Sequence, residues 1–159
     1  MSKLTVVVEP GKQEVHMTRE FNAPRELVFK AYTDPALVAR WWGLRQNTTR
    51  IDQMEARPGG RWRYVETDPE GNEFAFRGVY HDVVAPERIV QTFEFEGMPG
   101  HVLLETATFE DMGGKTKIIA QSVFQSVEDR DGMVASGMEY GAEEGYQRLD
   151  ELLATLETA

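Results

Sequence analysis

The first clear element of the chain is a stretch in which apolar and polar residues alternate. Over residues 15–21 the apolar side chains fall on every second position, which predicts a half-buried strand. Two short amphipathic helices are expected next. Asn22 and Pro24 suit the start of the first helix, and Asp34-Pro35 combines a capping residue with a first-turn proline for the second. The chain is therefore expected to run from one strand into two helices in tandem.

Residues 48–124 change to short strand-like segments separated by turn signals. Glycine, proline and acidic residues mark the turns, which lie at 57–60, 68–72, 85–87, 97–100 and 111–114. Strands joined by short turns predict an antiparallel meander. Within the strands aromatic residues occupy alternate positions, so one face of the sheet is expected to be aromatic.

The last part of the chain has the periodicity of a long amphipathic helix. A capping box at 126–129 and an Asp131-Gly132 pair precede apolar residues that recur at helical spacing from Met138 to Leu156. An antiparallel sheet with one apolar face needs a cover, and this helix is long enough to provide it. The predicted class is α+β, with one domain over 15–157 and an N-terminal extension over 1–14.

Charge and composition narrow the range of partners. The chain has 17 Lys and Arg against 27 Asp and Glu, a net charge of −10, and such a field repels nucleic acid and anionic membrane surfaces. No cysteine is present and no segment reads as a secretory or spanning sequence, so a cytoplasmic location is expected.

Motifs for catalysis and metal binding are missing from the sequence. No nucleophile elbow, phosphate-binding loop, dinucleotide fingerprint or zinc-helix motif occurs, and the three histidines are far apart. We expect no cofactor and no metal, and we assign no catalytic residue. An enzyme is disfavoured on this ground but stays open.

From the pattern alone the aromatic residues are expected to form a filled core, but two features point to a ligand cavity instead. Polar groups such as the Tyr64 hydroxyl can lie among the aromatic side chains, and apolar walls with a few polar groups are typical of a pocket. Glycines at 137, 141 and 145 recur inside the predicted last helix, where each costs about 1 kcal/mol relative to alanine. They indicate either close packing of the helix on the sheet or space for a ligand.

Glu105 is the most ambiguous residue of the predicted sheet. It shares a strand face with Ala107 and Phe109, so if Phe109 points inward, Glu105 does too. A carboxyl group in an apolar cavity would have a raised pKa and could bind a polar ligand group or act as an acid. Exposure to solvent near the strand end is the interpretation favoured for a lone glutamate.

Several motifs in order resemble one known family. They are FNAPRELVFKAYTDP at 21–35, WWG at 41–43, RPGGRW at 57–62, FRGVY at 76–80, PERIV at 86–90, GGKT at 113–116 and GYQRLDELL at 145–153. They are similar to the homologues of the activator of heat-shock-protein-90 ATPase, within the START-like and polyketide cyclase superfamily. The resemblance implies a helix-grip fold, in which a curved antiparallel sheet wraps around a long C-terminal helix and encloses a cavity. The eukaryotic activators also carry a separate chaperone-binding domain, which we do not expect within these 159 residues.

The leading hypothesis is that a small hydrophobic or aromatic ligand binds between the sheet and the last helix. The residues expected at this site are Trp41, Trp62, Tyr64, Phe76, Tyr80, Phe93, Glu105, Met138 and Gly141. A cyclase or hydrolase that uses the same cavity is the first alternative. A protein-interaction module that regulates a chaperone is the second, and a homodimer also stays open.

Overall fold

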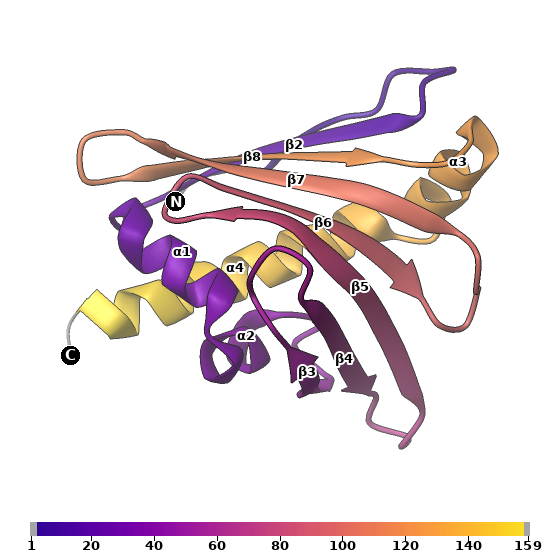
Figure 1. Ribbon diagram of the computed structural model, residues 1–159, viewed down its shortest axis with the longest axis horizontal. Coiled ribbons are helices and arrows are strands. Elements are labelled where there is room, and N and C mark those ends of the chain that lie inside the picture. Colours follow the sequence, from indigo (N-terminus) through magenta and orange to yellow (C-terminus); the bar gives the residue numbers. More distant parts are fainter. Residues whose placement is uncertain (1–2, 158–159) are drawn as a thin grey trace.

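The computed structural model describes residues 3–157, which form one curved sheet and four helices (Figure 1). The elements in chain order are β1 (Thr5–Val7), β2 (Glu14–Phe21), α1 (Arg25–Thr33), α2 (Pro35–Trp41), β3 (Thr48–Met54), β4 (Arg61–Thr67), β5 (Glu73–Val84), β6 (Arg88–Phe95), β7 (Val102–Asp111), β8 (Thr116–Val123), α3 (Val127–Ala135) and α4 (Met138–Glu157). The predicted order of strand, two helices, strands and long helix is confirmed.

All strand pairs in the sheet are antiparallel, in the order β1-β2-β8-β7-β6-β5-β4-β3. Strands β3 to β8 form the expected meander, and β2 lies beside β8, the last strand of that meander. Because β2 and β3 lie far apart in the sheet, α1 and α2 carry the chain from one side of it to the other. Residues 5–7, expected to be part of an extension, form the edge strand β1 on β2.

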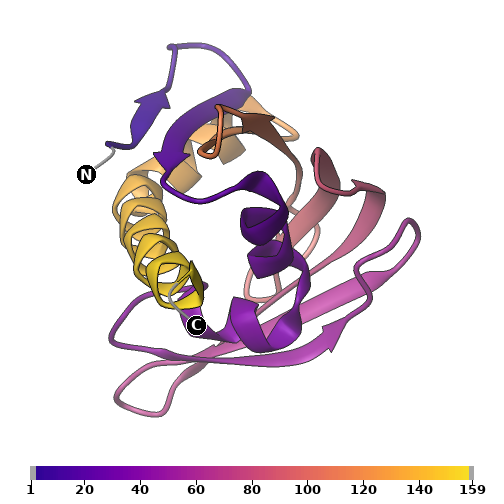
Figure 2. The same cartoon turned by 90° about the vertical axis from the view of Figure 1, so that its left-hand side faces the viewer.

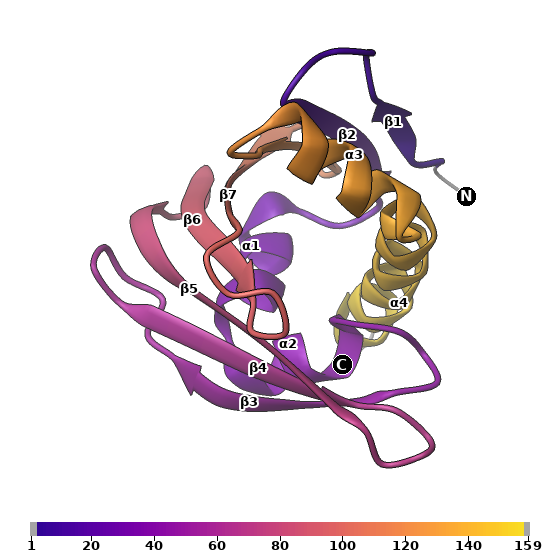
Figure 3. The ribbon, with the colours of Figure 1, turned by 90° about the vertical axis from the view of Figure 1, so that its right-hand side faces the viewer.

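The sheet curves around its helices, and α4 runs along the concave side. Figures 2 and 3 show α4 on the open side of the curve between β2 and β3, with α1 and α2 inside the curve at one end. Leu149, Leu152 and Leu153 of α4 are buried in the main core together with residues of α1, α2 and the sheet. Apolar burial of this kind is the main force that holds the long helix on the sheet.

Two of the predicted helix caps are confirmed and one is wrong. The backbone N–H of Ala36 donates to Asp34 Oδ1 over 3.0 Å at the start of α2, and the N–H of Asp129 donates to Ser126 Oγ over 3.0 Å at α3. At α1 the N-cap position belongs to Pro24, and no side chain caps that helix. Asn22 lies two residues earlier and takes no part.

Gly137 lies between α3 and α4 and not inside a helix, which corrects the prediction. Its φ of +93° belongs to the left-handed region, which glycine adopts without the steric cost that other residues incur. The chain turns there, and only Gly141 and Gly145 of the predicted glycine series lie within α4.

Candidate functional site

A cavity of about 330 Å³ lies between the concave face of the sheet and α4, near the small end of the range for ligand pockets. Residues of α1, α2, α3 and the turn that follows α2 also line it. Its walls are mainly apolar. The polar side chains that line it are Tyr32, Tyr64, Gln91, Glu105, Ser122 and Tyr146. Thr106 and Gln121 also border it, but strand alternation places their side chains on the other face of the sheet.

The two glycines of α4 leave room on the helix side of the cavity. An added Cβ at Gly141 or at Gly145 would meet no atom within 4 Å, and both residues line the cavity. Close packing of the helix against the sheet therefore does not explain these glycines. The missing side chains enlarge the cavity, which is the second of the two interpretations drawn from the sequence.

Most of the residues expected at the site line this one cavity. They are Trp41, Trp62, Tyr64, Phe93, Glu105, Met138 and Gly141. Trp41 contributes little surface, since it is only 7% exposed and its indole N–H donates to the backbone carbonyl of Ala31 over 2.9 Å.

Phe76 and Tyr80 do not line the cavity, which corrects that part of the expected site. The ring of Phe76 packs against Trp42 with centroids 5.1 Å apart and against Phe93 at 5.5 Å. Tyr80 is 1% exposed, and its hydroxyl is hydrogen-bonded to Tyr64. Both residues share the concave face of the sheet, but other aromatic side chains lie between them and the cavity.

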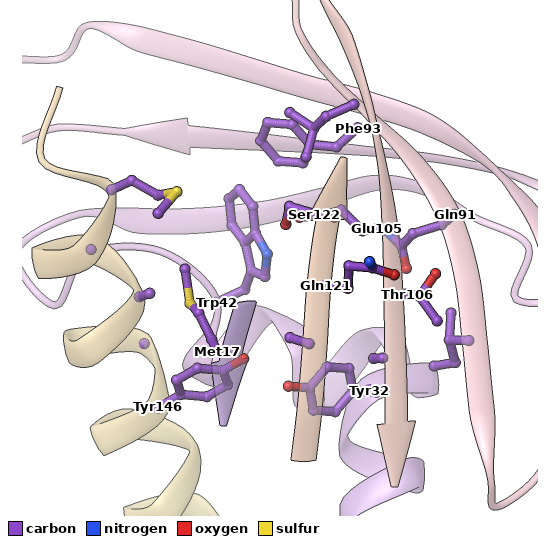
Figure 4. A pocket seen from close by; sticks show the side chains of 18 of the residues that line it. Met17, Tyr32, Trp42, Gln91, Phe93, Glu105, Thr106, Gln121, Ser122 and Tyr146 are labelled. Carbon is purple, nitrogen blue, oxygen red and sulfur yellow. The ribbon is translucent and has the colours of Figure 1, made fainter. Parts of the chain in front are cut away.

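The turn after α2 brings Trp42 to the wall of the cavity, where its ring lies between α4 and the strands in Figure 4. Gly43 has a φ of +92°, and a Cβ there would lie 2.7 Å from Glu66 Oε1, so this position requires glycine. Glu66 accepts a hydrogen bond from the N–H of Leu44 over 2.8 Å. The Arg148 guanidinium of α4 donates to the Trp42 and Gly43 carbonyls over 3.3 and 2.9 Å. The WWG motif is thus a turn fixed between β4 and α4.

Glu105 faces the cavity, so the exposure expected for it is wrong. Phe109, on the same face of β7, is 1% exposed, and the alternation that links the two residues holds. Across the sheet Glu105 lies opposite Gln91 of β6 and Ser122 of β8. Within the described chain nothing hydrogen-bonds to its carboxylate, and burial raises its pKa from 4.5 to about 7.

Three tyrosines surround the cavity near this carboxyl group. The hydroxyls of Tyr32 in α1 and Tyr146 in α4 face each other (Figure 4) and are hydrogen-bonded. Burial raises the pKa of Tyr32 and Tyr64, and it raises the pKa of Tyr146 to about 12. The negative charge of Glu105 adds to each of these increases. All three phenols are therefore neutral at physiological pH.

Several cavity residues were not anticipated from the sequence. Met17 continues the inward alternation of β2, and Tyr146 continues the apolar stripe of α4, so both patterns contained the signal. Ser122 lines the cavity because the register of β7 with β8 places it opposite Glu105, and this register cannot be predicted from the sequence. Arg19 of β2 does not line the cavity; it is 4% exposed and lies over the Phe21 ring at 4.6 Å.

The comparisons with known proteins agree with this architecture. The sequence profile of the family described as activator of Hsp90 ATPase homolog 1-like protein matches residues 22–154. The chain belongs to this family. The family resemblance drawn from the sequence motifs is therefore confirmed. The helix-grip fold that this Hsp90 ATPase activator-like family implied is confirmed as well.

Solved structures resemble this activator-like chain over nearly its whole length. A crystal structure of a protein from Rhodobacter sphaeroides is 28% identical, with a TM-score of 0.88 over 96% of this chain and 99% of that one. A solution structure from Arthrobacter aurescens is 25% identical, with a TM-score of 0.88 over 95% and 91%. The AHSA1 protein from Silicibacter pomeroyi, 20% identical over 89% and 98% with a TM-score of 0.75, shares the fold. No match was found among curated proteins.

Residues 3–157 contain neither a membrane-spanning helix nor a cluster of metal ligands. None of the helices there is both long and apolar enough to cross a membrane. The same residues contain no group of three or more His, Asp or Glu side chains that could hold a metal ion.

Proposed function

We propose that the protein binds a small, mainly apolar molecule in the cavity between α4 and the concave face of the sheet. The observation that carries this proposal is a cavity of about 330 Å³ with aromatic and aliphatic walls and a few polar groups. In Figure 4 the polar groups Glu105 and Gln91 lie on the strand side of the cavity and Tyr146 lies on the helix side. Family membership supports it, because small-ligand binding is one of the activities the resemblance implies.

A catalytic use of the same cavity is the second candidate. Glu105 is a lone acid in apolar surroundings with a pKa of about 7, and a group with a pKa near the working pH is suited to proton transfer. Shielded acid–base chemistry on a bound ligand would need no further motif. Loss of turnover in a Glu105→Gln variant that still binds the ligand would distinguish catalysis from binding alone.

Thermal unfolding with and without ligands tests the binding proposal. Apolar compounds of different shapes are added one at a time, and the midpoint of unfolding is measured. A ligand present at 100 times its Kd adds about 2.7 kcal/mol to the free energy of unfolding. For a chain of this length the midpoint should rise by about 5–10 °C.

A matched pair of variants shows whether the cavity is the binding site. Gly141→Leu puts a side chain into the cavity and should abolish the shift. Gly132→Leu changes an exposed helical glycine of α3 that also has no atom within 4 Å of its added Cβ, and it should leave the shift unchanged. An equal shift in wild type and Gly141→Leu would contradict the proposal.

A further inference from the structure

Among the described residues, the ionisable side chains of the cavity wall include a carboxyl group but no cation. Its ionisable residues are Glu105 and the three tyrosines 32, 64 and 146, and within the described chain no lysine, arginine or histidine lines it. The tyrosines are neutral phenols near pH 7. Any charge that the protein places in the cavity is therefore negative and comes from one residue.

Among residues 3–157, no side chain or backbone group is paired with the carboxylate of that residue. Gln91 and Ser122, its neighbours across the sheet, are uncharged. The buried cation on the same side of the sheet, Arg19, lies 3.7 Å from Asp150 and donates to the Glu20 carbonyl. An ionised carboxylate without a counter-ion is costly in an apolar site. A ligand that carries the missing positive charge would remove this cost.

Aromatic rings line the space next to the carboxylate. Trp42 and Tyr64 meet at 5.1 Å, and Trp62 lies 5.8 Å from Phe93. Faces of such rings attract cations through their quadrupoles, and the attraction is larger when the cation is desolvated. The net charge of −10 also raises the local concentration of cations around the protein.

We propose that the ligand of the cavity is an organic amine, in which an apolar body fills the aromatic space and a protonated amino group pairs with Glu105. This inference rests on the proposed function, since it specifies the chemical class of the molecule that the cavity takes. Carboxylates and phosphates do not fit, because the cavity wall offers them no cation and the nearest charge repels them. A neutral alcohol or ketone hydrogen-bonded to protonated Glu105 is the competing outcome.

Amine binding at this site should depend on pH in a defined direction. The groups that surround Glu105 are Tyr32 on α1, Tyr64 on β4 and Tyr146 on α4, none of which loses its proton near neutrality, and Arg19 on β2, which is paired with Asp150. Glu105 alone titrates, around a pKa of about 7. Only the ionised form pairs with an ammonium group, so affinity for an amine should rise about tenfold from pH 6 to pH 8. A neutral ligand should show no such rise.

Isothermal titration calorimetry with matched pairs of compounds tests the inference. In each pair the same apolar body carries either an amine or a hydroxyl: 2-naphthylmethylamine and 2-naphthylmethanol, tryptamine and tryptophol, 1-adamantylmethylamine and 1-adamantylmethanol. At pH 8 we expect the wild-type protein to bind at least one amine about tenfold more tightly than its alcohol. The same amine should bind about tenfold more weakly at pH 6.

Two variants show whether the preference for the amine depends on the charge of Glu105 or on the loss of any negative charge from the protein. Glu105→Gln keeps the shape of the side chain and should abolish the preference for the amine while the alcohol still binds. Glu110→Gln removes the same charge from an exposed position of β7 and should keep the preference. Circular dichroism confirms that both variants are folded.

The outcomes distinguish this inference from the proposed function. Alcohols that bind as tightly as their amines, or an amine preference that survives in Glu105→Gln, would overturn the amine assignment and leave ligand binding intact. If no member of any pair binds to the wild-type protein, both the amine assignment and this view of the cavity are refuted.

Discussion

Replacing Glu105 with glutamine should make the protein more stable at high pH and change little at low pH. Burial raises the pKa of this carboxyl group from 4.5 to about 7, so the folded state resists its ionisation. Below pH 4.5 the group is neutral in both the folded and unfolded states and has no effect. As the pH rises from 4.5 to 7 the unfolded chain ionises first, and the wild-type protein loses stability. Above pH 7 the loss is complete and constant.

The size of the effect follows from the shift in pKa. A difference of about 2.5 between the folded and unfolded pKa values corresponds to a full loss of up to about 3 kcal/mol. Between pH 5.5 and pH 8 the part of this loss that develops is up to about 2 kcal/mol. Both pH values lie above the sequence pI of about 4.8, so the protein keeps a net negative charge throughout the comparison.

Urea unfolding at these two pH values gives the required free energies. The free energy of unfolding of Glu105→Gln minus that of the wild type should increase by up to about 2 kcal/mol from pH 5.5 to pH 8. Glu110→Gln, exposed on the same strand, should show no such increase. A Glu105→Gln difference that stays constant within about 0.5 kcal/mol would mean that Glu105 ionises as freely in the folded protein as in water, and the reasoning about its burial would be refuted.

Two further predictions concern the elements that build the cavity. Arg148→Met leaves the carbonyls of the Trp42 turn without their guanidinium donor. We therefore expect the free energy of unfolding in urea to fall by about 2–3 kcal/mol and the near-ultraviolet circular dichroism spectrum to change. A fall of less than about 0.5 kcal/mol would count against this role of Arg148. Leu149→Ala, at a position with 0% exposure, should cost about 2–5 kcal/mol. Leu104→Ala, at 42% exposure, should cost less than about 1 kcal/mol, and equal losses would contradict the assigned core.

The fold could be predicted from the sequence because its elements have strong and different periodicities. Alternation gives β2 and the meander, and helical spacing gives α4. The capping residue of α1 and the position of Gly137 outside α4 could not be predicted in this way. Asn22 and Pro24 are both typical of helix starts, and a glycine at a four-residue interval reads as helical although the backbone there turns with a positive φ.

The candidate site was predictable at the level of a sheet face but not at the level of single contacts. Alternation places Phe76 and Tyr80 on the concave face, yet it does not show that other aromatic rings lie between them and the cavity. The neighbours of Glu105 depend on strand register, which arises from pairing across the sheet. Alternation along the strand did place Glu105 on the same face as Phe109. The prediction of an exposed Glu105 was wrong because it followed the general rule that glutamate side chains are mostly exposed.

The position of α4 in the chain has a consequence for how the protein folds during synthesis. Translation proceeds from the N-terminus, so every strand and the three short helices leave the ribosome before α4, which supplies Gly141, Gly145 and Tyr146 to the cavity. Until α4 docks, the concave aromatic face is open to water and the cavity does not exist. A molecule that occupies the cavity can therefore bind only after this last step, and it would act by holding the docked state in place.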